Sequence, residues 1–173
     1  RAQDSSRWFH WEASAALPVK QGLSHAITGI SHGALVVAGG SNFDGRIQDG
    51  GKKIVHDKIY VASDPDIMNW GEPGRLPWPL SNAAVLQLAN GLLVIGGTHG
   101  ETASDRVFLL YWDAGTGTIK IDSSWARLPV PLSSPSAAMS GKNIFVAGGQ
   151  SPDNTPQKTF YTLELAEDGN AGP

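Results

Sequence analysis

The sequence of 173 residues lacks cysteine altogether, and this absence excludes several kinds of site. A chain without thiols forms no disulfide framework, has no thiolate nucleophile and binds no zinc through cysteine. The sequence also lacks any run of roughly 18 consecutive apolar residues, the length that a membrane-spanning helix needs. We therefore expect no membrane partner.

The chain is also poor in charge, with 17% charged residues and a net charge of −3. Proteins that attract nucleic acids or anionic membrane surfaces carry a basic excess, which is missing here, so we expect no nucleic-acid partner. Glycine and proline are abundant instead, with 21 and 11 residues, and 40% of the chain is hydrophobic. This composition favours a globular domain of short strands and tight turns over a disordered segment.

An internal repeat organises the sequence. Three segments each contain a turn signal, a short apolar run and a glycine pair: 33–40, 90–97 and 141–149. The glycine pairs recur at intervals of roughly 50–60 residues, which is the period of propeller-type repeats. Short apolar runs that end in glycine are typical of strands buried on both faces, because glycine lets a neighbouring chain approach closely.

Further markers keep the same period. A Leu-Pro pair precedes each glycine pair, a tryptophan precedes each Leu-Pro pair or lies close to it, and a strand-like run follows each glycine pair. The Leu-Pro pairs begin at Leu17, Leu76 and Leu128, the tryptophans are Trp11, Trp70 and Trp125, and the runs are 57–61, 105–110 and 159–163. We interpret the tryptophans as packing residues of the repeat.

Four short strands in roughly 50 residues are typical of a kelch blade, and blades form rings of roughly 4–8. The sequence therefore predicts an all-β fold, a kelch-type β-propeller of about three four-stranded blades. The expected blades are 17–70, 71–125 and 126–166, with 1–16 as a closing strand and linker and 167–173 as a tail. Three blades do not close a ring, so the expected partner is the rest of the propeller or a second copy of the chain.

Several loop and strand segments also resemble those of a known family of kelch proteins. The segments that carry it are 38–46 with 50–61, then Gly74-Arg75-Leu76-Pro77-Trp78-Pro79-Leu80, 128–132 and 145–150. They resemble the N-acetylneuraminate epimerase (sialic acid mutarotase) family, in particular the cyclically permuted mutarotases. The resemblance implies a six-bladed ring, of which this chain is about half. It also implies an isomerase that interconverts anomers of a sugar acid, N-acetylneuraminate, by acid/base ring opening without cofactor or metal.

Two departures from the family limit what can be transferred. The first loop has Arg46-Ile47-Gln48-Asp49 where relatives usually carry a proline and a tryptophan. The family's catalytic glutamate and arginine follow a Gly-Glu step, whereas Gly100-Glu101 is offset relative to Arg106. The motif therefore transfers no catalytic residue to this chain.

Candidate site residues come from the loops, because function on a propeller belongs to loops held by rigid blades. The expected substrate-binding residues are Ser41, Asn42, Arg46, Lys52, Lys53, Asn82 and Gln150. The first loop is the most basic and suits a sugar carboxylate. The open alternative is that Lys52 and Lys53 are solvated charges beside a strand.

Anomer interconversion needs one acid and one base with pKa values near neutrality. His99 and Glu101 share one loop and are the expected catalytic pair, although polar loop residues that only contact water remain the alternative. His25 lies in an apolar run and is interpreted as a core histidine. The five histidines show no metal-ligand spacing, so we expect no metal and no cofactor.

A second function stays open: a non-catalytic kelch module that binds a glycan or a protein through the same loops. The location also stays open. The first residues, Arg1-Ala2-Gln3-Asp4, are compatible with the remnant of a cleaved signal peptide, which favours a periplasmic or secreted protein over a cytoplasmic one.

Overall fold

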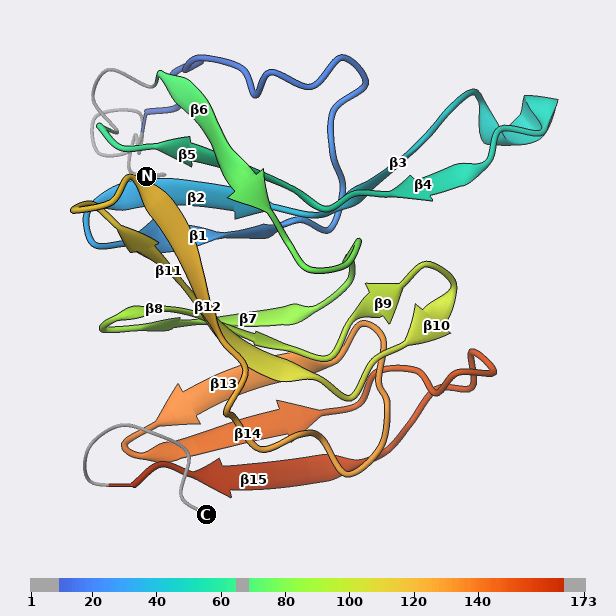
Figure 1. Cartoon of the computed structure of the whole chain (residues 1–173). Coiled ribbons are helices and arrows are strands. Elements are labelled where there is room, and N and C mark those ends of the chain that lie inside the picture. Colours follow the sequence, from blue (N-terminus) through green and yellow to red (C-terminus); the bar gives the residue numbers. More distant parts are fainter. Residues whose placement is uncertain (1–9, 65–68, 167–173) are drawn as a thin grey trace, which may run out of the picture.

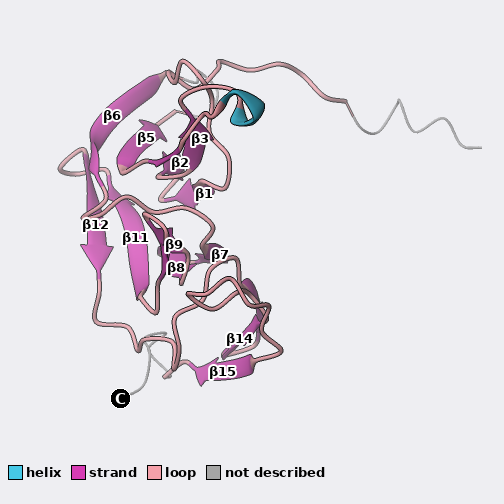
Figure 2. Cartoon of the chain, turned by 90° about the vertical axis from the view of Figure 1, so that its right-hand side faces the viewer, coloured by secondary structure: helices cyan, strands magenta, loops and turns pink. Residues whose placement is uncertain are grey.

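The computed structural model describes residues 10–64 and 69–166, and the fold is all-β. Three antiparallel sheets follow one another along the chain in an arc (Figures 1 and 2). The first sheet contains β1 (Ile27–Ser31), β2 (Ala34–Ala38), β5 (Lys58–Ala62) and β6 (Trp70–Arg75). The second contains β7 (Ala84–Leu88), β8 (Gly91–Ile95), β11 (Val107–Asp113) and β12 (Thr118–Asp122). The third contains β13 (Ser136–Ser140), β14 (Asn143–Ala147) and β15 (Phe160–Glu164).

Each sheet is one blade of a kelch-type β-propeller, as the repeat predicts. The third blade has three strands within the described residues. In the first blade, β6 pairs with β5 and runs to Arg75, beyond the expected boundary at residue 70. Residues 10–16 of the expected closing strand form no strand, and residues 1–9 and the expected tail 167–173 lie outside the described residues.

Two small hairpins project from the same end of the blades (Figure 1). One is formed by β3 (Ser41–Phe43) and β4 (Lys53–Val55), with a 3₁₀ turn, η2 (Ile47–Asp49), between them. The other is formed by β9 (Thr98–His99) and β10 (Thr102–Ala103). No helix in the described part of the chain is long and apolar enough to cross a membrane.

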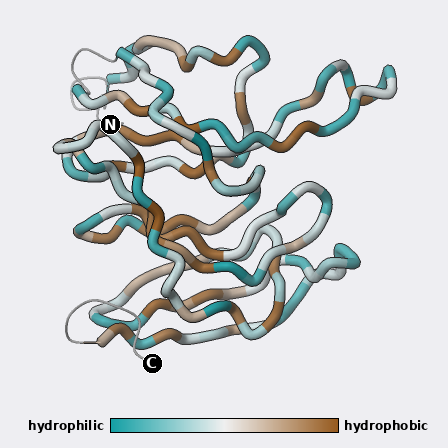
Figure 3. Tube along the Cα trace, viewed as in Figure 1, coloured by the Kyte–Doolittle hydropathy of each residue, from teal (hydrophilic) through white to brown (hydrophobic). Residues whose placement is uncertain are grey.

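The core lies between the blades, where hydrophobic strand segments face one another (Figure 3). All five residues of β8 are buried, because the second blade is covered on both faces. Val36 and Phe108 belong to the apolar cluster between the first and second blades, and Leu93 and Ile144 belong to the cluster between the second and third. This packing explains the continuous apolar runs in the sequence.

The glycine pairs are needed because the following blade crosses them closely. Gly96 has a φ of +65°, and a Cβ added there would lie 2.7 Å from the carbonyl oxygen of Leu132 in the third blade. The second glycine of the pair, Gly97, donates its N–H to the same carbonyl at 2.9 Å. The first pair meets the carbonyl of Leu80 in the same way. The glycines of the first two pairs therefore lie at contacts between blades.

The other markers have related roles. The buried Leu76 and Leu128 donate their N–H groups to the carbonyls of Asp57 and Asp105 in the preceding blade. Trp125 is buried, and Trp70 is half-buried with its Nε1 donating to the carbonyl of Ala15 at 3.2 Å. Trp11 is 98% exposed, so its interpretation as a packing residue is wrong for the described chain.

Candidate functional site

The site is built where two kinds of loop meet at one end of the blades. We call residues 17–26, 76–83 and 128–135 the leading loops, and residues 41–57, 98–106 and 150–159 the doublet loops, since these follow the glycine pairs. In each blade one antiparallel bridge joins the two loops: Ser24 with Ser41, Ser81 with Thr98, and Ser133 with Gln150. The bridges fix the loops of successive blades at the same level.

A cleft of about 990 Å³ lies between these loops. Its walls come from the leading loops of the second and third blades and from the doublet loops of all three. The lining residues are Lys52, Lys53, Val55, Pro79, Asn82, Thr98, Gly100, Glu101, Ser133, Ser134, Gln150, Pro152 and Asn154. The cleft thus combines two ammonium groups, one carboxylate, and several amide and hydroxyl groups, a set suited to a polyhydroxylated acid.

Five of the expected site residues line this cleft: Lys52, Lys53, Asn82, Glu101 and Gln150. Both lysines are exposed, and neither forms an ion pair with the described residues. Asn82 is half-buried, and its Nδ2 donates to the hydroxyl of Thr98 at 3.3 Å. The lysine ammonium groups and the carboxylate of Glu101 are therefore free to meet a ligand.

Three expected residues of the first doublet loop lie outside the lining of the cleft. Ser41 is buried, with its hydroxyl 3.3 Å from that of Ser24. Asn42 donates to the carbonyl of Gly22 and accepts from His56 Nε2 at 2.9 Å. Arg46 lies at the hairpin tip, where its Nε is 3.8 Å from Asp49. These three side chains hold the hairpin.

The structure does not bring His99 and Glu101 into the same cleft. His99 lies beside a second depression of about 250 Å³, lined also by Trp78, Arg106 and Arg127. Its Nδ1 donates to the carbonyl of Pro79 at 3.1 Å. Thr98 faces the 990 Å³ cleft, and its neighbour His99 points the other way because side chains alternate along the short strand β9.

Other residues of the cleft were not among the expected ones. Thr98, Ser133, Ser134 and Asn154 supply hydroxyl and amide groups. Ser134 follows a bridge serine as Asn82 does, so the repeat itself carried the signal for this position. Beside Asn154, hydrogen bonds from the Ser151 hydroxyl and the Thr155 N–H lower the pKa of Asp153, which keeps it ionised in its turn. The described residues contain no group of three or more His, Asp or Glu placed to hold a metal.

Comparison with known proteins shows that the chain has sequence relatives. No family model matches the chain. A protein of Vibrio cholerae serotype O1 (strain ATCC 39315 / El Tor Inaba N16961) named N-acetylneuraminate epimerase is 30% identical over 120 residues, 61% of this chain and 31% of the relative. Its namesake from Yersinia pestis (strain Pestoides F) is 35% identical over 107 residues, 56% of this chain and 26% of the relative. The chain is similar to the N-acetylneuraminate epimerases.

The resemblance of the loop sequences to the N-acetylneuraminate epimerase family is thereby confirmed. The relatives are longer proteins, and the chain matches only part of each. The matched segments make up 26–31% of the length of these epimerases. The solved structure of YjhT superposes with a TM-score of 0.68 at 15% identity, over 90% of this chain and 53% of YjhT. The chain therefore has the fold of about half of that protein.

Proposed function

We propose that the chain is part of a sialic acid mutarotase-like enzyme that interconverts anomers of N-acetylneuraminate by acid/base ring opening. The observation that carries the proposal is the cleft of about 990 Å³, in which two unpaired lysines face the same space as a carboxylate. The similarity to proteins named N-acetylneuraminate epimerase supports N-acetylneuraminate as the ligand of this cleft.

The lysines supply recognition of the acid group. Lys52 and Lys53 form no ion pair with any described residue, so an incoming carboxylate does not displace a protein partner. Ammonium groups attract a carboxylate from several ångströms away, and screening by salt weakens the attraction. Asn82 and Gln150 provide amide groups for the hydroxyls of the sugar.

Glu101 is proposed as one proton-transfer group. Ring opening protonates the ring oxygen and removes the proton of the anomeric hydroxyl, and it requires no redox step. Among the described residues that line the cleft, Glu101 is the carboxylate. We do not retain His99 as its partner, because its imidazole is bound to the carbonyl of Pro79 beside another depression.

We also propose that a further blade packs on the third one, supplied by the rest of a longer chain or by a second copy. Phe160 is 66% exposed, whereas Ile59 and Val107, which hold the same place in the first two blades, are 1% and 6% exposed. Phe145 stacks on Phe160 with 5.8 Å between ring centroids, so the outer face of this blade is apolar.

A time course of freshly released α-N-acetylneuraminate tests the function. We expect the protein to speed the appearance of the β-anomer in one-dimensional NMR spectra, and the Glu101→Gln variant to lose at least about 100-fold of this rate. Asp113→Asn, at the last residue of β11 where a hairpin turn begins, is the matched carboxylate control and should retain the rate. An unchanged time course with the wild-type protein would refute the proposal.

The alternative is a non-catalytic module that binds a glycan or a protein through the same cleft. One observation favours it: the expected acid–base pair does not share the cleft, which leaves a single carboxylate there. Saturable binding of N-acetylneuraminate without any change in the rate of anomer exchange would support this alternative.

A further inference from the structure

Three residues in equivalent positions share an unusual backbone conformation. His25, Asn82 and Ser134 each follow a bridge serine, and their φ values are +53°, +56° and +50°. This left-handed region is sparsely populated by residues other than glycine. The repeat places one such residue in the leading loop of every described blade.

A series of backbone hydrogen bonds links these residues from blade to blade. The N–H of Asn82 donates to the carbonyl of His25 at 3.2 Å, and the N–H of Ser134 donates to the carbonyl of Asn82 at 2.8 Å. Unfavourable backbone conformations persist where the surroundings fix them, and they concentrate at binding sites. The three residues therefore form one fixed row along the inner edge of the arc.

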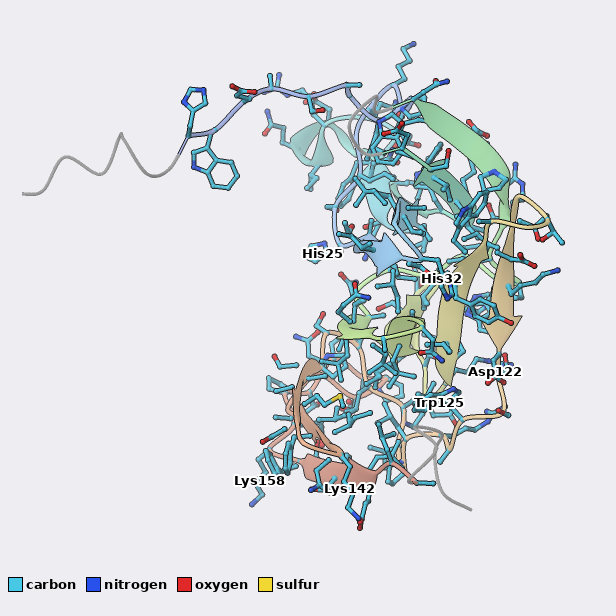
Figure 4. The ribbon with its side chains drawn as sticks, turned by 90° about the vertical axis from the view of Figure 1, so that its left-hand side faces the viewer. His25, His32, Asp122, Trp125, Lys142 and Lys158 are labelled. Carbon is cyan, nitrogen blue, oxygen red and sulfur yellow. The ribbon has the colours of Figure 1, made fainter. Side chains whose placement is uncertain are left out.

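Two members of this row already line the cleft. Asn82 and Ser134 belong to its wall, and His25 holds the same place one blade earlier. Figure 4 shows His25 at the concave edge of the arc, beside the beginning of β1 and turned away from the sheets. His25 is exposed, so its interpretation as a core histidine is wrong.

The imidazole of His25 also differs from the other histidine rings of the described residues. The ring nitrogens of His25 form no hydrogen bond or ion pair with any described residue. The other four rings contact Glu12 (His10, 3.3 Å), the Trp112 carbonyl (His32, 2.8 Å), Asn42 (His56, 2.9 Å) and the Pro79 carbonyl (His99, 3.1 Å). The backbone of His25 is thus held in place while both ring nitrogens stay available.

We infer that His25, Asn82 and Ser134 form one ligand-binding row, and that His25 contacts the bound sugar acid through its imidazole. The inference rests on the proposed function and adds a contact residue from the first blade's leading loop. The row presents an imidazole, an amide and a hydroxyl group from successive blades, and these groups can form hydrogen bonds with one face of a polyhydroxylated ligand.

His25→Gly separates ligand contact from a structural role. Glycine adopts a φ of +53° without strain, so the unfolding midpoint should stay the same or rise. Affinity for N-acetylneuraminate, measured by calorimetric titration, should fall about fivefold, the effect of one lost hydrogen bond. His32→Gly is the matched control, because His32 has a φ of +47° in the β1–β2 turn and does not line the cleft. The affinity of this variant for N-acetylneuraminate should not change.

The outcomes are distinct. Unchanged affinity in His25→Gly, with binding by the wild-type protein, overturns this inference and leaves the proposed function standing. A loss of affinity together with a lowered unfolding midpoint also overturns it, because the side chain then has a structural role. Wild-type protein that binds no N-acetylneuraminate overturns the proposed function and the inference with it.

Discussion

The charges of the cleft come from side chains that have no partner within the described protein. Lys52 is held only through its backbone, whose N–H donates to the carboxylate of Asp44 at 2.6 Å and whose carbonyl accepts from the N–H of Asp44 at 3.1 Å. Its ammonium group has no partner among the described residues. Several basic residues elsewhere are paired, as Arg75 is with Asp57 and Lys142 with Glu164. Two neighbouring lysines without ion-pair partners cost the fold little stability at the wall of the cleft, because both ammonium groups are exposed to water. Their charge favours an anionic ligand.

The contribution of these lysines should appear in substrate binding. We expect Lys52→Ala and Lys53→Ala each to raise KM for N-acetylneuraminate about two- to fivefold, because a solvent-exposed charge pair contributes up to about 1 kcal/mol. The value of kcat should change little, and the difference in KM should shrink in high salt. Lys142→Ala, at the far end of the third blade, is the matched control. An equal rise in KM in all three variants would show that these lysines act through the overall charge of the protein and not through a binding site.

The sequence predicted five of the nine polar residues that line the cleft, and the reason is physical. The loops that follow the glycine pairs lie at one end of the blades, so their residues could be predicted to share a site. This holds for Lys52, Lys53, Glu101 and Gln150. His99 was misassigned to the same space as Glu101, since the alternation along a two-residue strand is invisible without its register. His25 was taken for a core residue because Leu23 and Ala26 flank it, and its left-handed backbone leaves no trace in the sequence.

The strands could be predicted wherever an apolar run ended in glycine. β6 could not, because Trp70–Arg75 contains Gly71, Pro73 and Gly74, which are rare in strand interiors. Proline is accepted here because β6 is the edge strand of its sheet, and the register with β5 shifts between Ile59 and Val61. The boundary between the first two blades therefore depends on pairing and not on residue type.

The connection that follows β12 is held by one carboxylate. Hydrogen bonds from the Ser124 side chain and N–H, and from Trp125, lower the pKa of Asp122. Trp125 is buried in the cluster between the second and third blades, so Asp122 fixes the segment that inserts this ring (Figure 4). The ionised form of Asp122 is therefore the form that the fold stabilises.

This arrangement predicts a pH-dependent effect of Asp122→Asn. A carboxyl group whose pKa is lower in the folded state stabilises the fold above its unfolded pKa, about 3.9, and loses this effect as pH falls through the folded value. At pH 7 we expect the variant to be less stable by about 1 kcal/mol, because the group is partly screened by water. Thermal unfolding from pH 7 to pH 2.5 should show that the difference from wild type begins to shrink below about pH 4 and continues to shrink as the pH falls further. A difference independent of pH would contradict this explanation.

At the scale of the whole molecule, the third blade differs from the middle one. The second blade is covered on both faces, and its strand β8 is fully buried. On the third blade, Phe160 and Met139 are 66% and 44% exposed, and both glycines of the third pair are only half-buried. The arc therefore ends on a surface of the same kind as the interfaces inside it.

Alanine substitutions in the glycine pairs test whether that surface is covered by another blade. A Cβ at Gly96 would lie 2.7 Å from the Leu132 carbonyl oxygen, whereas a Cβ at Gly148 would lie 3.6 Å from its nearest neighbour, the Gln157 carbonyl oxygen. Both residues have a positive φ, +65° and +64°, so alanine carries the same backbone penalty at each, about 1–2 kcal/mol. Only Gly96→Ala also forces two blades apart.

We therefore expect Gly96→Ala to destabilise the 173-residue chain by about 3 kcal/mol or more, and Gly148→Ala by only about 1–2 kcal/mol. Urea unfolding of both variants measures the difference directly. In a protein whose third blade is followed by another, Gly148→Ala should become as damaging as Gly96→Ala, because a neighbouring leading loop then crosses Gly148 as Leu132 crosses Gly96. If the gap between the variants stayed the same in the closed ring, the outer face of the third blade would not be an interface between blades.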